Sequence, residues 1–173
     1  MITPISKPIP LPVGVSIRAA QPSDGETIAL LVRALAAYEK LAHDAVATGD
    51  DFRAHLFGPN RAAEAILAER DGAAIGFALF FTTFSTFRGR PGLYLEDIFV
   101  QPEQRGLGIG RALIASVAKI AVERGCARLE WAVLDWNAPA IGFYATLGAR
   151  PLDDWTVHRL DGLELAGLAE LAD

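Results

Sequence analysis

The feature that most constrains the fold is a strand-like run that passes through a glycine-rich loop into an amphipathic helix. Residues 92–100 are largely apolar, as in a buried strand. The loop that follows has glycines at three alternate positions between Arg105 and Arg111. The next helix is predicted to end at Gly125 and to bury one face, formed by Gly110, Leu113, Ile114, Val117 and Ile120. This succession requires a sheet covered by helices.

Strand and helix patterns alternate along the rest of the chain. We expect a strand over 15–19, a helix that starts at a capping box of Ser23 and Glu26 and runs to about Lys40, and a short helix over 50–56. A hairpin is predicted over 65–69 and 74–84, with a type I′ turn at Asp71-Gly72. Later elements are a strand over 128–134, a helix over 137–147, a strand over 156–160 and a short tail helix. The fold class is mixed α/β: one domain over residues 15–173 after an extended arm over 1–14.

Composition excludes several classes of protein. The 173 residues include 51% hydrophobic ones, enough for a sizeable core, and the formal net charge is 16 − 21 = −5. That acidic balance argues against nucleic acid as a partner. No apolar run approaches the roughly 18 residues of a membrane span, and the N-terminal stretch lacks a signal-peptide core, so we expect a cytoplasmic protein without a membrane partner. The single cysteine, Cys126, excludes a disulfide framework and is expected to be a buried small hydrophobe.

The glycine loop, Arg105 to Arg111, fits neither of two common phosphate-binding motifs. Rossmann spacing fails because Arg111 occupies the third glycine position, and a P-loop fails because no Gly-Lys-Ser/Thr follows. Because glycine has no Cβ, the backbone N–H groups of such a loop can still surround an anion at a helix N-terminus. The flanking arginines suit a pyrophosphate. The alternative is a plain tight connection between a strand and a helix.

Two further segments accompany the loop. Tyr94-Leu95-Glu96-Asp97-Ile98-Phe99-Val100 precedes it, and Trp136-Asn137 with Phe143-Tyr144 lies downstream. Together with Ala37-Tyr38-Glu39, they resemble the GNAT superfamily of N-acetyltransferases, and within it the spermidine/spermine (diamine) and thialysine acetyltransferase branch. The resemblance covers most of the chain, from Ile17 to about Leu160. It implies a GNAT fold whose mixed sheet has antiparallel N-terminal strands and a splayed parallel pair.

The resemblance also implies direct acetyl transfer from acetyl-CoA to a primary amine of a small cationic substrate, without a metal, in a homodimer. The implied acetyl-CoA contacts are the backbone of Ile98, Phe99 and Val100, the loop residues Arg105, Gly106, Leu107, Gly108, Ile109, Gly110 and Arg111, and Asn137 and Tyr144. The implied substrate contacts are Tyr38, Glu39, Glu96 and Asp97, with the strand Glu130, Trp131 and Ala132 as further candidates.

Tyr144 and Glu96 are the two catalytic candidates. Tyr144 is expected to protonate the departing CoA thiolate, although transfer from a phenol is uphill by about 2 kcal/mol in water, so the site must acidify it or it only donates a hydrogen bond. The alternative for Tyr144 is a half-buried packing residue. Glu96 is expected to hold the amine and to draw off its proton, directly or through water, because an alkylammonium of pKa about 10.4 is rarely neutral at pH 7. The alternative for Glu96 is a structural salt bridge.

Other polar residues carry weaker indications. Asn137 is expected to cap its helix, which is compatible with binding the cofactor. Glu39 lies at a helix end that disfavours a carboxylate, which hints at an amine partner. Adjacent strand residues point to opposite faces, so Glu96 and Asp97 are expected to do so, and Trp131 is expected in the core. His43, His55 and His158 show no metal or hydrolase spacing.

The resemblance leaves the amine open. A polyamine, thialysine, another amino acid analogue and an aminoglycoside all fit a small cationic substrate. Two other functions compete with this one: acetylation of a protein or peptide amine, and a CoA-binding regulatory module without turnover.

Overall fold

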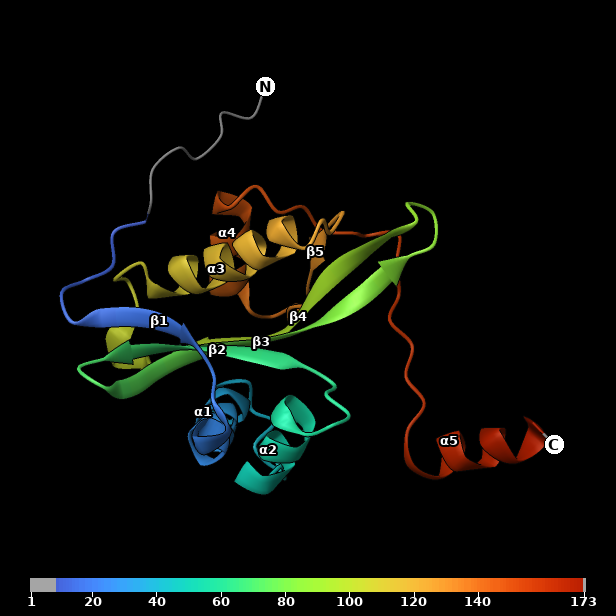
Figure 1. The fold of residues 1–173 in the computed structure, drawn as a ribbon. Helices are drawn as coiled ribbons and strands as arrows, with labels where there is room; N and C mark the ends of the chain where they lie inside the picture. Colours follow the sequence, from blue (N-terminus) through green and yellow to red (C-terminus); the bar gives the residue numbers. More distant parts are fainter. Residues whose placement is uncertain (1–8, 173) are drawn as a thin grey trace. The chain divides into compact units, whose positions relative to one another are not determined.

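The computed structural model describes residues 9–172 and divides into two compact units, one up to Ala132 and one from Val133 on (Figure 1). Most of the predicted N-terminal arm, residues 1–8, lies outside the described residues. Residues 9–14 form no helix or strand.

The first unit is built on one five-stranded sheet in the order β1-β2-β3-β4-β5. The strands are β1 (Val15–Ala19), β2 (Glu64–Arg70), β3 (Ala73–Ser85), β4 (Arg90–Val100) and β5 (Leu129–Glu130). The pairs β1-β2, β2-β3 and β3-β4 are antiparallel, whereas β5 runs parallel to β4. The predicted mixed sheet with one parallel pair is confirmed.

The turn between β2 and β3 also follows the prediction. Asp71 and Gly72 both have positive φ, 51° and 82°. Two residues of this conformation form the type I′ turn, whose twist matches that of the flanking strands.

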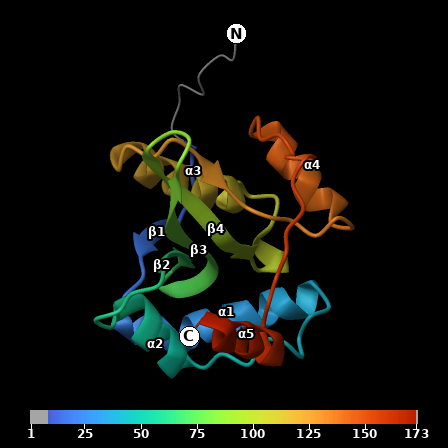
Figure 2. The same ribbon diagram turned by 90° about the vertical axis from the view of Figure 1, so that its right-hand side faces the viewer.

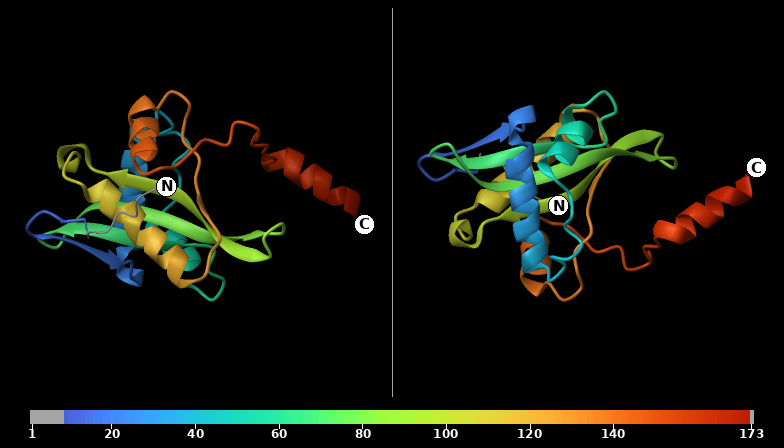
Figure 3. Two further views of the ribbon diagram at one scale, coloured as in Figure 1. Left: turned by 90° about the horizontal axis from the view of Figure 1, so that it is seen from above. Right: turned by 90° about the horizontal axis from the view of Figure 1, so that it is seen from below.

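Helices cover both faces of the sheet in the first unit (Figures 1 and 2). The helices α1 (Gly25–Tyr38) and α2 (Gly49–Phe57) lie on one face, and α3 (Ile109–Glu123) lies on the other, as the views from above and below show (Figure 3). The core beneath α1 and α2 is apolar and buried and includes Ile28, Leu31, Leu35, Leu56, Leu67, Phe77, Leu79 and Phe99. On the other face α3 packs against β2, β3 and β4 and buries Leu113 and Val117 completely.

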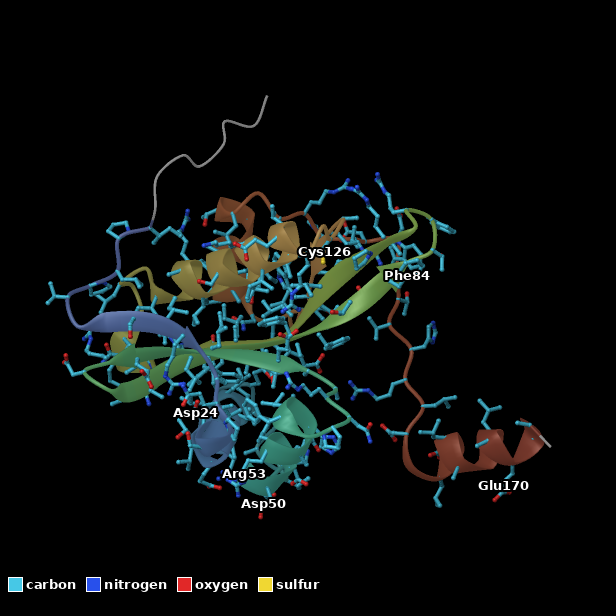
Figure 4. The ribbon with its side chains drawn as sticks, in the orientation of Figure 1. Asp24, Asp50, Arg53, Phe84, Cys126 and Glu170 are labelled. Atoms are coloured by element: carbon cyan, nitrogen blue, oxygen red, sulfur yellow. The ribbon has the colours of Figure 1, made fainter. Side chains whose placement is uncertain are left out.

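The capping box predicted at Ser23 and Glu26 is wrong, because the polar group at this position is Asp24. A short 3-10 helix over Pro22–Asp24 precedes α1, and the Asp24 carboxylate accepts a hydrogen bond of 2.7 Å from the N–H of Gln21. It also binds the Arg18 guanidinium at 2.7 and 2.9 Å. Arg18 lies on β1, so this ion pair ties the start of α1 to the sheet. Figure 4 labels Asp24 at this end of the helix.

Several predicted elements are shorter than expected. The strand expected over 128–134 is reduced to the two residues of β5, and Trp131 is half-buried rather than in the core. Cys126 is also half-buried. The strand expected over 156–160 does not form. A strand needs a hydrogen-bonded neighbour, and in the described part of the chain these residues have none.

The second unit contains α4 (Ala138–Thr146), α5 (Gly162–Ala169) and a final 3-10 helix (Glu170–Ala172). The predicted helices in this region are thus confirmed. In residues 9–172 no helix is both long enough and apolar enough to cross a membrane.

Candidate active site

A β-bulge in β4 sets the geometry of the site. Phe80 of β3 lies opposite Leu95, but the preceding residue of β3, Leu79, lies opposite Asp97, so Glu96 is an extra residue in the strand. Leu79 and Phe80 point to opposite faces of the sheet, and their partners therefore do so as well. It follows that Glu96 and Asp97 share one face, the face covered by α1 and α2. The expectation that they point to opposite faces is wrong, because the bulge cancels the strand alternation.

Three carboxylates lie at this face, two from the bulge and one from the end of α1. Glu39 follows the last residue of α1, and its charge and that of Glu96 both act on Asp97. Burial, with smaller contributions from Glu96 and Glu39, raises the pKa of Asp97 to about 6. Burial also raises the pKa of Glu39. These are three of the residues predicted to contact the substrate, and together they form a partly buried negative site that would favour a cation.

Tyr94 belongs to the same face and was not among the predicted site residues. Its pKa is raised by burial and then by the charges of Glu96 and Glu130, while a hydrogen bond from the backbone of Ala132 opposes that shift. Its ring lies 5.3 Å from that of Phe81, measured between centroids. The signal that could have identified Tyr94 is its position two residues before Glu96 in the same strand.

The segment Glu130 to Ala132, predicted to contact the substrate, adds less negative charge and less buried surface to the site than expected. The Glu130 carboxylate forms a salt bridge of 2.6 Å with the Nε of Arg128, which offsets its charge. Of the two residues that follow, Trp131 is half-buried and Ala132 is exposed.

Beyond Tyr94, the sheet opens on the outer side of β4. The strand β5 pairs with β4 only at Leu93 and Tyr94. From Glu96 onward the outer edge of β4 has no strand neighbour within residues 9–172, whereas its inner edge continues to pair with β3 as far as Val100. This matches the predicted splay, and it leaves the segment Ile98 to Val100 at an open sheet edge.

The glycine loop continues from the end of β4 into α3. Gly108 precedes α3 as its N-cap and has a φ of 81°, a left-handed conformation that favours glycine. It has no side chain to cap the first turn of α3, whose N–H groups point outward along the helix axis. Among residues 9–172, a Cβ at Gly106 would meet no atom within 4 Å, so these residues leave the backbone of the loop open on that side.

The residues of this loop fit the acetyl-CoA phosphates that the sequence predicts. The positive end of α3 and the open glycine backbone suit an anion. Beside the loop, the side-chain oxygen of Gln104 is buried and has no hydrogen-bond partner among the described residues. No group of three or more His, Cys, Asp or Glu side chains that could hold a metal ion occurs in the described part of the chain.

Arg105 makes contacts that the sequence did not indicate. Its Nε donates a hydrogen bond of 3.0 Å to the carbonyl oxygen of Val100. Its guanidinium carbon lies 4.5 Å from the ring centroid of Tyr38 and 5.6 Å from that of Phe99. A residue predicted for the cofactor thus contacts a residue predicted for the substrate.

Asn137 and Tyr144 lie in the second unit. Asn137 is buried, and its Oδ1 accepts a hydrogen bond of 3.3 Å from the N–H of Ala140, which confirms the predicted cap of α4. Tyr144 is half-buried on α4, with its ring 5.3 Å from that of Phe143. Their roles toward acetyl-CoA remain predictions.

Comparison with known proteins identifies the class. The sequence matches the profile of the acetyltransferase (GNAT) family over residues 30–149, which is more than half of the chain. The protein therefore belongs to the GNAT family of acetyltransferases.

Its relatives include enzymes that act on amines. A thialysine N-epsilon-acetyltransferase of Sus scrofa is 39% identical over 166 residues, which cover 90% of this chain and 97% of that protein. An L-ornithine N5-acetyltransferase of Arabidopsis thaliana is 31% identical over 200 residues, covering 90% of this chain and 88% of that protein. Among solved structures, an integron cassette protein from the mobile metagenome of V. cholerae has a TM-score of 0.77 at 26% identity, covering 92% of this chain and 99% of that one. The chain is an N-acetyltransferase of GNAT type.

Proposed function

We propose that the protein transfers an acetyl group directly from acetyl-CoA to a primary amine of a small cationic substrate, of the thialysine or diamine kind. The observation that carries the proposal is the group of three carboxylates formed by Glu96 and Asp97, which the bulge in β4 puts on one face, and Glu39 at the end of α1. The names of the relatives, which include thialysine and L-ornithine acetyltransferases, support the same substrate class.

In this proposal the carboxylates act on the amine. An alkylammonium must lose a proton before its nitrogen can attack a thioester. Glu96 is the exposed member of the group, so it accepts that proton directly or through a water molecule. Asp97 and Glu39 are more buried and hold the positive charge of the substrate.

Acetyl-CoA is bound and polarised mainly by backbone groups. Gly108 and the first turn of α3 receive the pyrophosphate, and Arg111 adds positive charge at the same place. N–H groups on the open edge of β4, between Ile98 and Val100, polarise the thioester carbonyl. When the C–S bond breaks, Tyr144 donates a proton or a hydrogen bond to the CoA thiolate. Homodimer formation remains a prediction of the resemblance, and a cytoplasmic location remains a prediction from the sequence.

A turnover assay tests the proposal. Purified protein is given acetyl-CoA with thialysine, ornithine, spermidine, an aminoglycoside or a lysine-containing peptide, and release of CoA is followed. We expect the highest kcat/KM with a small cationic amine. A preference for the peptide would make the protein a peptide acetyltransferase, and binding of acetyl-CoA without turnover of any amine would contradict the proposed function.

A further inference from the structure

We infer that Arg105 is a positioning residue that holds the end of α1 against β4 and thereby couples the glycine loop to the amine-binding carboxylates. This inference rests on the proposed function, because it assigns the amine to that group. Arg105 comes from the loop, Tyr38 from the end of α1, and Phe99 and Val100 from the end of β4. One side chain therefore joins the three elements that meet at the site.

The contacts of Arg105 use what distinguishes arginine from lysine. A guanidinium is planar, so it can lie over aromatic rings with its faces while its N–H groups donate hydrogen bonds at its edge. Here the guanidinium lies over the Tyr38 ring at 4.5 Å and near the Phe99 ring at 5.6 Å, and the Nε donates to the carbonyl of Val100. A lysine at this position would keep the charge and lose both the stacking and the Nε donor.

The position of Tyr38 determines that of a neighbouring carboxylate. Glu39 follows Tyr38 directly, and at Lys40 the chain leaves the helix with a φ of 64°. Tyr38 packs against the core cluster that contains Phe99. Because Glu39 acts on Asp97, the end of α1 must stay against β4 for the two carboxylates to face one substrate. The Arg105 contact with Tyr38 maintains this arrangement.

A residue that only bound phosphate would have a different effect. It would alter the affinity for acetyl-CoA and leave the amine KM unchanged. Arg111 provides that comparison, since it lies in the first turn of α3 and is proposed for the pyrophosphate. If Arg105 instead holds the end of α1 in place through Tyr38, replacing Arg105 raises the amine KM. Replacing Tyr38 as well then adds little to that effect.

The test is a double-mutant cycle with Arg105→Lys, Tyr38→Leu and both together. We expect the amine KM to rise about 5-fold in each single variant and by about the same factor, not the product, in the double variant. Tyr38→Phe keeps the ring that Arg105 covers, so it should raise the amine KM less than Tyr38→Leu does. Arg111→Lys should raise the Kd for acetyl-CoA, measured by calorimetry, more than the amine KM. Arg88→Lys, at an exposed site in the β3–β4 turn, serves as a control for the substitution itself.

Two results would overturn the inference: an unchanged amine KM in Arg105→Lys, or effects of Arg105→Lys and Tyr38→Leu that multiply. The parental protein and the three variants of the cycle are also unfolded in urea. Their free energies of unfolding measure the contact between Arg105 and Tyr38 independently of activity. If the parental protein transfers no acetyl group to any amine, the proposed function fails. Urea unfolding alone then tests the contact between Arg105 and Tyr38. Fully additive losses of stability would refute the contact, and non-additive losses would support it.

Discussion

Glu96 and Asp97 lie on the same face of β4, although they are consecutive residues of a strand. The cause is the bulge at Glu96, which shifts the pairing so that Asp97 faces Leu79. Asp97 consequently lies beneath the end of α1, where the charges of Glu96 and Glu39 act on it. This relationship gives the site its negative charge and leads to the first prediction.

Asp97 should make stability depend on pH. Its pKa rises from 3.8 to about 6 on folding, so the folded protein binds a proton that the unfolded chain has already released. The stability contributed by that proton is complete below about pH 4 and is lost as the pH rises through about 6. Relative to the parent, Asp97→Asn should therefore gain about 2 kcal/mol in free energy of unfolding between pH 4 and pH 7, allowing for partial exposure.

Urea unfolding at several pH values between 4 and 7 measures this difference. Asp153→Asn, at an exposed position, is the control and should follow the parental curve. A difference between Asp97→Asn and the parent that stays constant with pH would show that Asp97 is not the group that titrates.

The second prediction concerns the glycine loop. Gly108→Ala should weaken acetyl-CoA binding, because a side chain at a φ of 81° strains the loop by about 1 to 2 kcal/mol and shifts the backbone that meets the pyrophosphate. Gly72→Ala is a matched control, since Gly72 has a φ of 82°. Among the described residues an added Cβ would meet no atom within 4 Å at Gly72, and at Gly108 only the Cγ2 of Ile9, at 4.0 Å.

Both variants should lose similar stability in urea unfolding, but only Gly108→Ala should bind acetyl-CoA more weakly in calorimetry. Equal acetyl-CoA affinity in the two variants would remove the loop from the cofactor site.

The third prediction separates the chemistry of Tyr144 from its packing. Tyr144→Phe keeps the ring near Phe143 and removes only the hydroxyl. If that hydroxyl serves the CoA thiolate, kcat should fall roughly 10- to 10³-fold while the affinity for acetyl-CoA changes little, because charge on sulfur develops only in the transition state. Thioesters with better leaving groups should reduce the difference in kcat between Tyr144→Phe and the parental protein. A parental kcat in a chemistry-limited assay would leave Tyr144 a packing role alone.

The features that the sequence predicted well depend on neighbouring residues. The Asp71-Gly72 turn, the strand that leads through the glycine loop into α3, and the Asn137 cap each rest on a few consecutive side chains. Backbone conformation and local hydrogen bonds decide such features, so a single sequence carries enough information for them.

The features that it missed depend on residues distant in the chain. The bulge at Glu96 exists only in the register that β4 adopts against β3. Asp24 begins α1 because Arg18 binds it from β1, and the same arginine binds Glu69 of β2. The strand expected over 156–160 has no partner strand in residues 9–172. The contact of Arg105 with Tyr38 likewise requires the folded sheet.

The most direct test of the account is steady-state kinetics of Glu96→Gln with the best amine, together with calorimetry of acetyl-CoA binding. Glutamine keeps the shape of the side chain but cannot accept the proton of the ammonium, so we expect kcat/KM for the amine to fall about 10²-fold or more. The Kd for acetyl-CoA should stay near the parental value. Glu103→Gln, on the exposed turn before the glycine loop, should leave both quantities unchanged. If kcat/KM for the amine hardly changes in Glu96→Gln, Glu96 is structural and the amine is activated elsewhere.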